Sequence, residues 1–286
     1  MMASFWLALL VCIPASGWTN SSVLQFIYTN NFQSYSAGSY PIPSNPLPGW
    51  TGMTSQSGLQ PAIVTRVGTT NNNALNLNST GGGATGYLSV NSRLLEGTTS
   101  AWEVAANTRY IASNLTPWYG FGGLLLSSTG DMSGDFLLVG IESGWGEVNA
   151  TTTWARPYAY WSLGGATSSG TLWPEGGAIR MSTDTWGPAL LTASRSGGGS
   201  SISFALDSAV DGLRSSTLTF SGAAATALDN LQYVGFANYF SNWQYDDLSV
   251  KGLSTATALA IPEPSALSLL GLAGFGLLLH RRRRQA

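Results

Sequence analysis

The chain has 286 residues, of which 9% are charged and 11% aromatic, with a formal net charge of −2; this low charge, with abundant Gly, Ser, Thr, Asn and Trp, favours a β-rich extracytoplasmic protein over a helical cytosolic enzyme. The only cysteine is Cys12 and the only histidine is His280, which excludes disulfides, a thiolate nucleophile, a Ser-His-Asp triad and a Cys/His zinc site in the body. The arginines outside the C-terminal run are scattered, which argues against nucleic-acid binding, because phosphate neutralisation needs a clustered basic face.

Residues 1–17 are predicted to be a signal peptide. An apolar segment from Phe5 to Ile13 is followed by a proline and small residues. Ala15 and Gly17 occupy the positions where signal peptidase requires small side chains. We therefore expect signal peptidase to cleave before Trp18 and the body to be exported.

The body, residues 18–253, reads as many short strands separated by turns rich in Gly, Asn and Ser. Apolar and polar residues alternate in runs such as Ser203–Leu206 and Thr217–Phe220. No segment shows sustained helical periodicity, although "SGAAATALDNLQ" could contribute one helical turn. Many short strands without alternating helices predict an all-β sandwich or barrel, and this span suits one two-sheet jelly-roll domain.

The two ends of the body add a resemblance. The opening "NNFQSYSAGSYPIPSNPLPGW" places Phe32, Tyr35 and Gly38 ahead of a Gly-Trp pair that ends at Trp50. The closing "VGFANYFSNWQYDDLSV" places two aspartates before alternating apolar residues. Both segments resemble the edges of a concanavalin A-like lectin/glucanase jelly roll. The resemblance implies a jelly-roll β-sandwich whose concave sheet can serve as a platform for sugars.

Tryptophan clusters in the middle of the body, at Trp145, Trp154, Trp161 and Trp173. Their rings could stack on sugar faces, or they could fill the core of a domain without disulfides, since each aromatic buries ~150–250 Å². In the strand "ARPYAYWSL" we expect Tyr158 and Trp161 to form the platform, with Tyr160 pointing the other way. The predicted ligand-binding residues are Trp145, Tyr158, Trp161 and Trp173.

The stretch "ESGWGE" gives a weaker hydrolase alternative. Retaining glucanases of the resembled fold carry Glu-x-Asp-x-x-Glu, whose outer glutamates act as nucleophile and acid/base about 5–5.5 Å apart. Glu142 and Glu147 have that spacing, but Gly144 stands in place of the aspartate. An odd separation also puts two side chains on opposite faces of a regular strand unless a bulge intervenes. We assign no catalytic residue.

Two aspartate pairs could bind calcium. Asp131 and Asp135 lie in the Gly-rich stretch "TGDMSGD", and Asp246 and Asp247 precede the last strand. Calcium prefers hard oxygen ligands, but neither spacing matches an EF-hand loop. A turn role is the simpler interpretation for both pairs, so we expect no cofactor, with calcium as the alternative.

A linker at residues 254–261 leads to a distinct C-terminal element at residues 262–286. The apolar run from Ala266 to Leu279 would measure about 21 Å as a helix, short of the ~30 Å hydrocarbon core of a bilayer. The arginines that follow mark the cytoplasmic side. We expect a short transmembrane helix with the body outside.

This element closely resembles the PEP-CTERM sorting signal. Its three parts stand in order: a Pro-Glu-Pro motif, a Gly- and Leu-rich apolar span and a terminal arginine cluster. The resemblance implies a Gram-negative bacterium, transient anchoring in the inner membrane, and cleavage near the motif by the protease-transpeptidase exosortase. It further implies delivery to the cell surface or an exopolysaccharide matrix. The predicted sorting residues are Pro262, Glu263, Pro264, Arg281, Arg282, Arg283 and Arg284.

Three functions remain open at this point. The leading prediction is a non-enzymatic, exosortase-sorted protein whose β-sandwich binds carbohydrate or envelope polysaccharide. The second is a glycan-active hydrolase or lyase of the same fold that uses Glu142 and Glu147. The third is a purely structural component of the extracellular matrix.

Overall fold

In a computed structural model of the chain, the segments whose apolar and polar residues alternate form strands with one buried face and one more exposed face. In β14 (Ser201–Ser208) every second side chain is buried, as the pattern of its sequence requires. The structure describes residues 24–40, 47–54, 62–65, 73–78, 85–96, 98–110, 120–143, 152–171, 179–182, 189–197, 199–239 and 242–254.

Nine strands form the first sheet, which we call sheet A. Besides β14 they are β1 (Gln25–Asn30), β2 (Gly38–Ser39), β4 (Ala62–Thr65), β5 (Asn73–Asn78), β7 (Thr98–Tyr110), β13 (Ala189–Arg195), β15 (Gly212–Thr219) and β17 (Asn242–Ser254). Their order is β15-β14-β13-β7-β17-β5-β4-β2, and β1 also pairs with β17.

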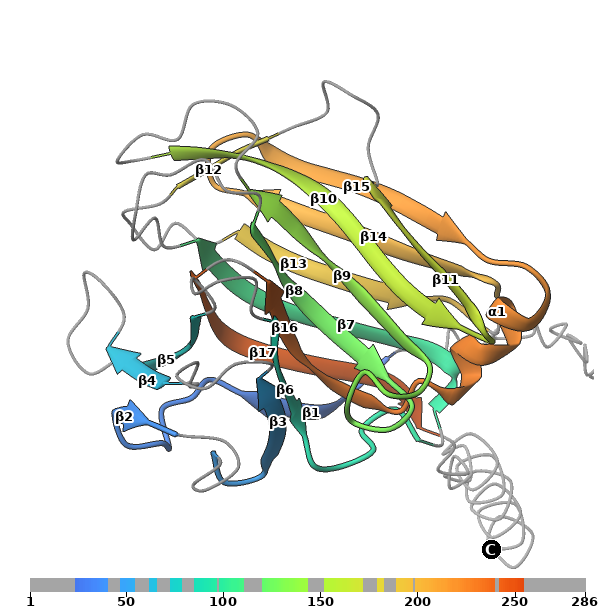
Figure 1. Cartoon of the computed structure of the whole chain (residues 1–286), viewed down its shortest axis with the longest axis horizontal. Coiled ribbons are helices and arrows are strands. Elements are labelled where there is room, and N and C mark those ends of the chain that lie inside the picture. Colours follow the sequence, from blue (N-terminus) through green and yellow to red (C-terminus); the bar gives the residue numbers. More distant parts are fainter. Residues whose placement is uncertain are drawn as a thin grey trace, which may run out of the picture.

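Eight strands form sheet B. They are β3 (Trp50–Thr54), β6 (Thr85–Val90), β8 (Gly120–Ser127), β9 (Phe136–Ser143), β10 (Thr152–Leu163), β11 (Ala166–Thr171), β12 (Ile179–Ser182) and β16 (Tyr233–Tyr239). Their order is β11-β10-β9-β8-β16-β6-β3, and β12 pairs with β10. The pairings in both sheets are antiparallel, and the strands of the two sheets cross over one another in Figure 1. The predicted all-β jelly-roll sandwich is confirmed.

Apolar side chains from the two sheets meet between them and form the main core. Aromatic rings occupy its centre: Phe236 of sheet B stacks on Tyr245 of sheet A with 4.2 Å between ring centroids. Trp50, Trp102 and Trp243 are each at most 2% exposed. These three tryptophans therefore fill the core, which has no disulfide to support it.

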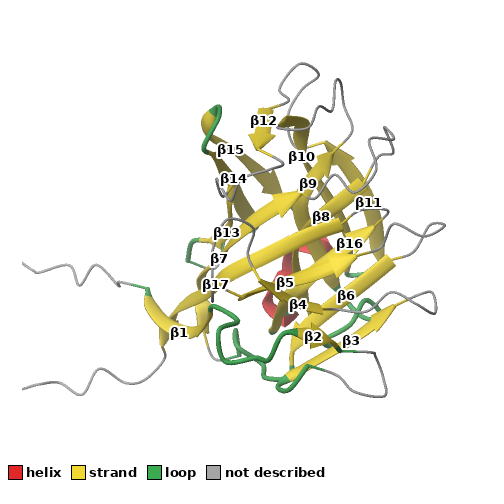
Figure 2. Ribbon diagram, turned by 90° about the vertical axis from the view of Figure 1, so that its left-hand side faces the viewer, coloured by secondary structure: helices red, strands yellow, loops and turns green. Residues whose placement is uncertain are grey.

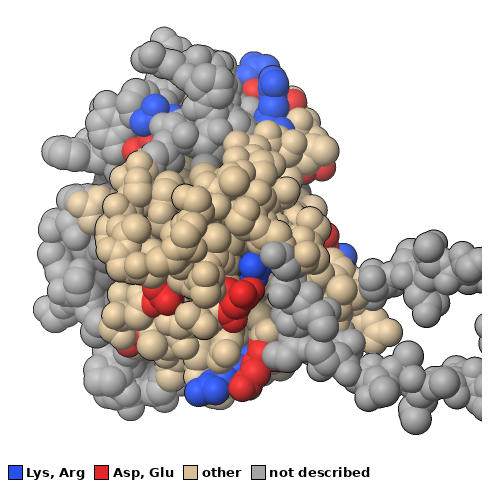
Figure 3. All heavy atoms as spheres, turned by 90° about the vertical axis from the view of Figure 1, so that its right-hand side faces the viewer, with Lys and Arg blue, Asp and Glu red and all other residues tan. Residues whose placement is uncertain are grey.

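A short helical segment covers one end of the sandwich. Helix α1 (Gly222–Ala227) and the 3-10 turn η1 (Leu228–Asn230) follow β15, where the sequence suggested one helical turn. Arg195, only 3% exposed, ties this segment to β13 through a 2.7 Å ion pair with Asp229. Figure 3 shows a wide area without charged side chains on this side of the molecule, in keeping with the low charge of the sequence.

The last strand of the body lies inside its sheet. β17 pairs with β7 along one side and with both β5 and β1 along the other. Figure 2 shows β1 beside β17 at one side of the molecule. The first and last strands of the described body are thus hydrogen-bonded neighbours.

No helix within the described ranges has the length and apolarity needed to cross a bilayer. The predicted signal peptide at residues 1–17, and the sorting element at residues 262–286 with its transmembrane helix, lie outside the described residues.

Candidate functional site

The two faces of β10 separate the predicted sugar-contacting residues. Ala155, Ala159 and Leu163 point into the main core, and Trp161 packs against that core on the same side. The Trp161 ring meets Phe220 edge to face at 5.5 Å. Tyr158 belongs to the opposite face of the strand.

The prediction that Tyr158 and Trp161 share a platform is therefore wrong. Side chains two residues apart share a face of a strand, and those three apart do not. Tyr160 lies with Tyr158, and the tryptophan lies on the core side. The period-two spacing in the sequence was the signal that could have identified the Tyr158–Tyr160 pair.

A second apolar cluster covers the face of sheet B that points away from sheet A. We call it the outer aromatic face. Its buried members all come from sheet B, and two half-buried tyrosines and a methionine pack against them. It comprises Tyr87, Phe121, Leu125, Phe136, Leu138, Ala237, Met132, Tyr158 and Tyr160.

Two glycines stand beside Tyr158 on the outer aromatic face. Gly123, Gly140 and Tyr158 stand in one row across β8, β9 and β10. A Cβ on Gly140 would fall 2.3 Å from the carbonyl oxygen of Gly122, so no side chain fits there. Phe121 and Tyr158 therefore meet across β9, with their ring centroids 5.8 Å apart.

One ion pair borders the outer aromatic face. Glu142 of β9 faces Arg156 of β10, and the arginine Nε donates to the glutamate Oε2 at 2.8 Å. Both side chains are largely buried, with 16% and 21% exposed. Phe121 is the register partner of Glu142 on the other side. The pair thus places a carboxylate and a guanidinium next to an aromatic ring. Both of these charged groups can form hydrogen bonds with a ligand.

The remaining predicted ligand-contacting residues, Trp145 and Trp173, lie outside the described residues, as does Glu147. Of the two glutamates in the hydrolase alternative, the described residues therefore include Glu142. Its carboxylate forms an ion pair with Arg156.

The loop between β8 and β9 borders the same face. Asp131 accepts hydrogen bonds from Ser133 and Thr129, which hold the pKa of its carboxyl below the ordinary value of 3.8. Met132 packs onto the outer aromatic face. Burial, and secondly the charge of Asp131, raise the pKa of Tyr87. The predicted turn thus positions a methionine against the aromatic rings.

The predicted calcium ligands make hydrogen bonds within the protein. Asp135 Oδ1 accepts from the backbone N–H of Gly164 at 2.7 Å, which ties this loop to the β10–β11 hairpin. In the described ranges no three Asp, Glu, His or Cys side chains gather as a metal site would require. Calcium binding at these residues stays an untested alternative.

The Asp246–Asp247 pair shapes a bulge in β17. Asp246 is buried, and its Oδ1 accepts the N–H of Asp247, which has a left-handed φ of 50°. The Asp247 carboxylate also accepts from Asn107 at 2.8 Å. A polar depression of about 360 Å³ opens beside the bulge, lined by Thr29, Asn30, Asn31, Asp247, Leu248 and Ser249.

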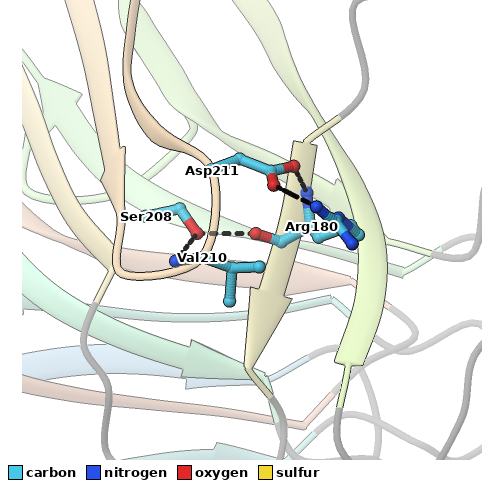
Figure 4. Close-up of polar contacts among 4 residues, drawn as sticks. All are labelled: Arg180, Ser208, Val210 and Asp211. Carbon is cyan, nitrogen blue, oxygen red and sulfur yellow. Dashed lines mark hydrogen bonds and ion pairs between the residues drawn. The ribbon is translucent and has the colours of Figure 1, made fainter.

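An arginine on the short strand β12 joins the two sheets (Figure 4). The Arg180 backbone N–H donates to Asp211 Oδ2 at 2.7 Å, and its guanidinium to Oδ1 at 2.9 Å. Ser208 Oγ donates to the Arg180 carbonyl oxygen. The guanidinium also lies 6.0 Å from the centre of the Trp154 ring. These contacts hold β12 of sheet B against the β14–β15 turn of sheet A.

The tail of the chain matches a known sequence pattern. Residues 260–284 match the PEP-CTERM protein-sorting motif. The chain is therefore an exported protein that is sorted by exosortase and held at the membrane in transit before its release at the surface. No curated protein matches the chain in sequence.

Solved structures are similar to the body at low identity. The marine PL-14 alginate lyase from Aplysia kurodai has 8% identity and a TM-score of 0.48, covering 79% of this chain and 98% of its own. The lectin from Bauhinia forficata in complex with GalNAc is 10% identical with a TM-score of 0.45, covering 77% of this chain and 99% of its own. A protein of unknown function from Shewanella oneidensis MR-1 is 13% identical with a TM-score of 0.43, covering 91% of this chain and 100% of its own. Identities and TM-scores this low carry no argument about function.

Proposed function

We propose that this exported protein binds carbohydrate, such as the polysaccharide of a Gram-negative envelope or its extracellular matrix, and does so without catalysis. The outer aromatic face is the proposed binding surface. Its half-buried Tyr158 and Tyr160 are the observation that carries the proposal. Delivery to the surface would place that face among extracellular polysaccharides.

The chemistry of this face supports sugar binding. Tyrosine has an apolar ring and a polar hydroxyl, so it can stack on the C–H face of a sugar and hydrogen-bond to a neighbouring hydroxyl. The Tyr158 and Tyr160 rings are braced by Phe121 and Phe136, with centroid distances of 5.8 and 5.3 Å. Braced rings lose little conformational freedom on binding. The Glu142–Arg156 pair supplies polar atoms at the border of the rings.

The binding test compares two faces of one strand. Tyr158→Ala and Tyr160→Ala should each weaken binding of a polysaccharide found on a glycan array, by ~10-fold in calorimetry. The matched control is Trp161→Ala, which removes a ring from the core side of β10. It should lower stability and leave the affinity of the folded protein unchanged. Equal affinity losses from Tyr158→Ala and Trp161→Ala would contradict the proposed surface.

The hydrolase alternative has its own test. Purified protein is incubated with β-glucans and assayed for new reducing ends, in parallel with Glu142→Gln and Glu147→Gln variants. We expect no product from any of them. Activity in the native protein that both variants lose would establish the enzyme instead. Failure to bind any glycan on the array would favour the purely structural role.

A further inference from the structure

Two large apolar side chains are exposed next to each other on β1. Phe26 is 66% exposed and Ile27 is 41% exposed, whereas their neighbour Tyr28 packs against the main core. The register with β17 shifts between Phe26 and Tyr28, so Ile27 is the extra residue of a bulge. The bulge turns the apolar pair outward while the strand stays paired.

A lysine accompanies this pair. Lys251 is the register partner of Phe26, and its ammonium lies 5.0 Å from the centre of the Phe26 ring. The same ammonium donates to Glu103 at 2.6 Å. We call Phe26, Ile27 and Lys251 the β1 patch. An aromatic and an aliphatic side chain beside a long cationic one is a combination suited to the boundary between lipid headgroups and acyl chains.

The β1 patch lies where the body ends. Gln25 pairs with Gly252, two residues before β17 ends at Ser254. The apolar run of the sorting element starts at Ala266, so the eleven residues 255–265 connect it to Ser254. A segment of this length spans about 40 Å when fully extended. While the sorting element holds the chain at the membrane, the patch is therefore confined to the neighbourhood of the bilayer.

We propose that the β1 patch contacts the bilayer while the chain is anchored by its sorting element. Phe26 and Ile27 enter the boundary between headgroups and acyl chains, and Lys251 stays at headgroup level. Because the contact is apolar, it does not require anionic lipid. The proposal rests on the sorting motif and on the exposed side chains, and it is independent of carbohydrate binding.

The test places a fluorescent probe beside the β1 patch in a chain that starts at Trp18, after the predicted cleavage site, and keeps the sorting element. This chain has no native cysteine, so a polarity-sensitive dye is attached to Gln25→Cys after reconstitution in phosphatidylcholine vesicles. The dye emission should shift to the blue, and lipids with nitroxide-labelled acyl chains should quench it at least twofold. Adding Phe26→Ser and Ile27→Ser to the labelled chain should abolish both effects, with circular dichroism checking that the fold is kept.

The matched control carries the dye at Leu213→Cys. Leu213 is 67% exposed, as Phe26 is, but lies on β15, five strand spacings or ~24 Å from β1 across sheet A. Its dye should show neither effect. Equal quenching at the two positions would overturn the proposal. So would a blue shift at Gln25→Cys that grows with protein density and resists lipid quenching, because that outcome identifies a second copy of the chain as the partner.

Discussion

Replacing Gly122 with alanine tests how tightly the two sheets are packed. Gly122 lies on β8 of sheet B, and its Cα faces the indole of Trp243 from sheet A. An added Cβ would lie 2.3 Å from the nearest indole carbon, where carbon atoms normally stay ~3.5–4.0 Å apart. Trp243 is 0% exposed and sits in a strand paired on both sides, so its ring has no free space to enter.

The expected cost follows from this geometry. Overpacking a filled core costs ~1–3 kcal/mol, and a contact this short belongs at the upper end. Alanine recovers ~0.4–1 kcal/mol by restricting the unfolded chain. The net destabilisation should be about 2 kcal/mol. For a body of this size, each kcal/mol corresponds to ~2–4 °C, so Tm should fall by ~4–8 °C.

Urea and thermal unfolding, followed by tryptophan fluorescence, measure this change. The matched control is Gly86→Ala on β6, where an added Cβ meets Asn238 Oδ1 at an ordinary 3.5 Å. That variant should be neutral or slightly stabilised. Combining Gly122→Ala with Trp243→Phe should destabilise less than the sum of the two single changes, because the smaller ring relieves the clash. If Gly122→Ala is as stable as Gly86→Ala, the close approach of the sheets is refuted.

Two further predictions concern single side chains. Burial raises the pKa of Asp211, but hydrogen bonds from the Arg180 backbone and guanidinium, with its charge, outweigh this and leave the pKa below 3.8. Asp211→Asn should therefore lower the free energy of unfolding by ~1 kcal/mol at pH 7, a small value because the Arg180 side chain is half exposed. Urea titrations should show this difference from the native protein vanish near pH 2, where Asp211 is protonated. Phe32→Ala should cost ~3–5 kcal/mol in urea unfolding, because Phe32 is fully buried against Trp50; a loss below 1 kcal/mol would contradict that packing.

Much of the fold was predictable because its signal is local. Alternation within β14 and β15 marks them as strands, and the Ala-rich stretch before Leu228 did form one helical turn. The strand β11 is hard to predict because "ATSSGT" is polar and lacks the alternation of a half-buried strand, and its residues 166–169 are exposed. It pairs with β10 through the turn at Gly164 and Gly165, whose φ values of 58° and 82° suit a tight hairpin.

The site was less predictable because it depends on pairing between distant strands. The meeting of Phe121 and Tyr158 requires β9 to lie between them with a glycine at Gly140. The contact between Arg180 and Asp211 joins residues 31 positions apart in different sheets. Residue types alone carry no information on which strands become neighbours.

The position of β17 sets an order for export and folding. The strand made last is inserted between β7 on one side and β5 and β1 on the other, so sheet A stays split until residue 254 has crossed the membrane. Arrest of translocation before that point leaves β7, β5 and β1 without their β17 partner, and such unpaired strand edges are prone to aggregation. The final closure of the body therefore depends on the strand that directly precedes the linker and the sorting element. A shortened version has to keep the β17 residues that pair with β7, β5 and β1 in order to complete sheet A.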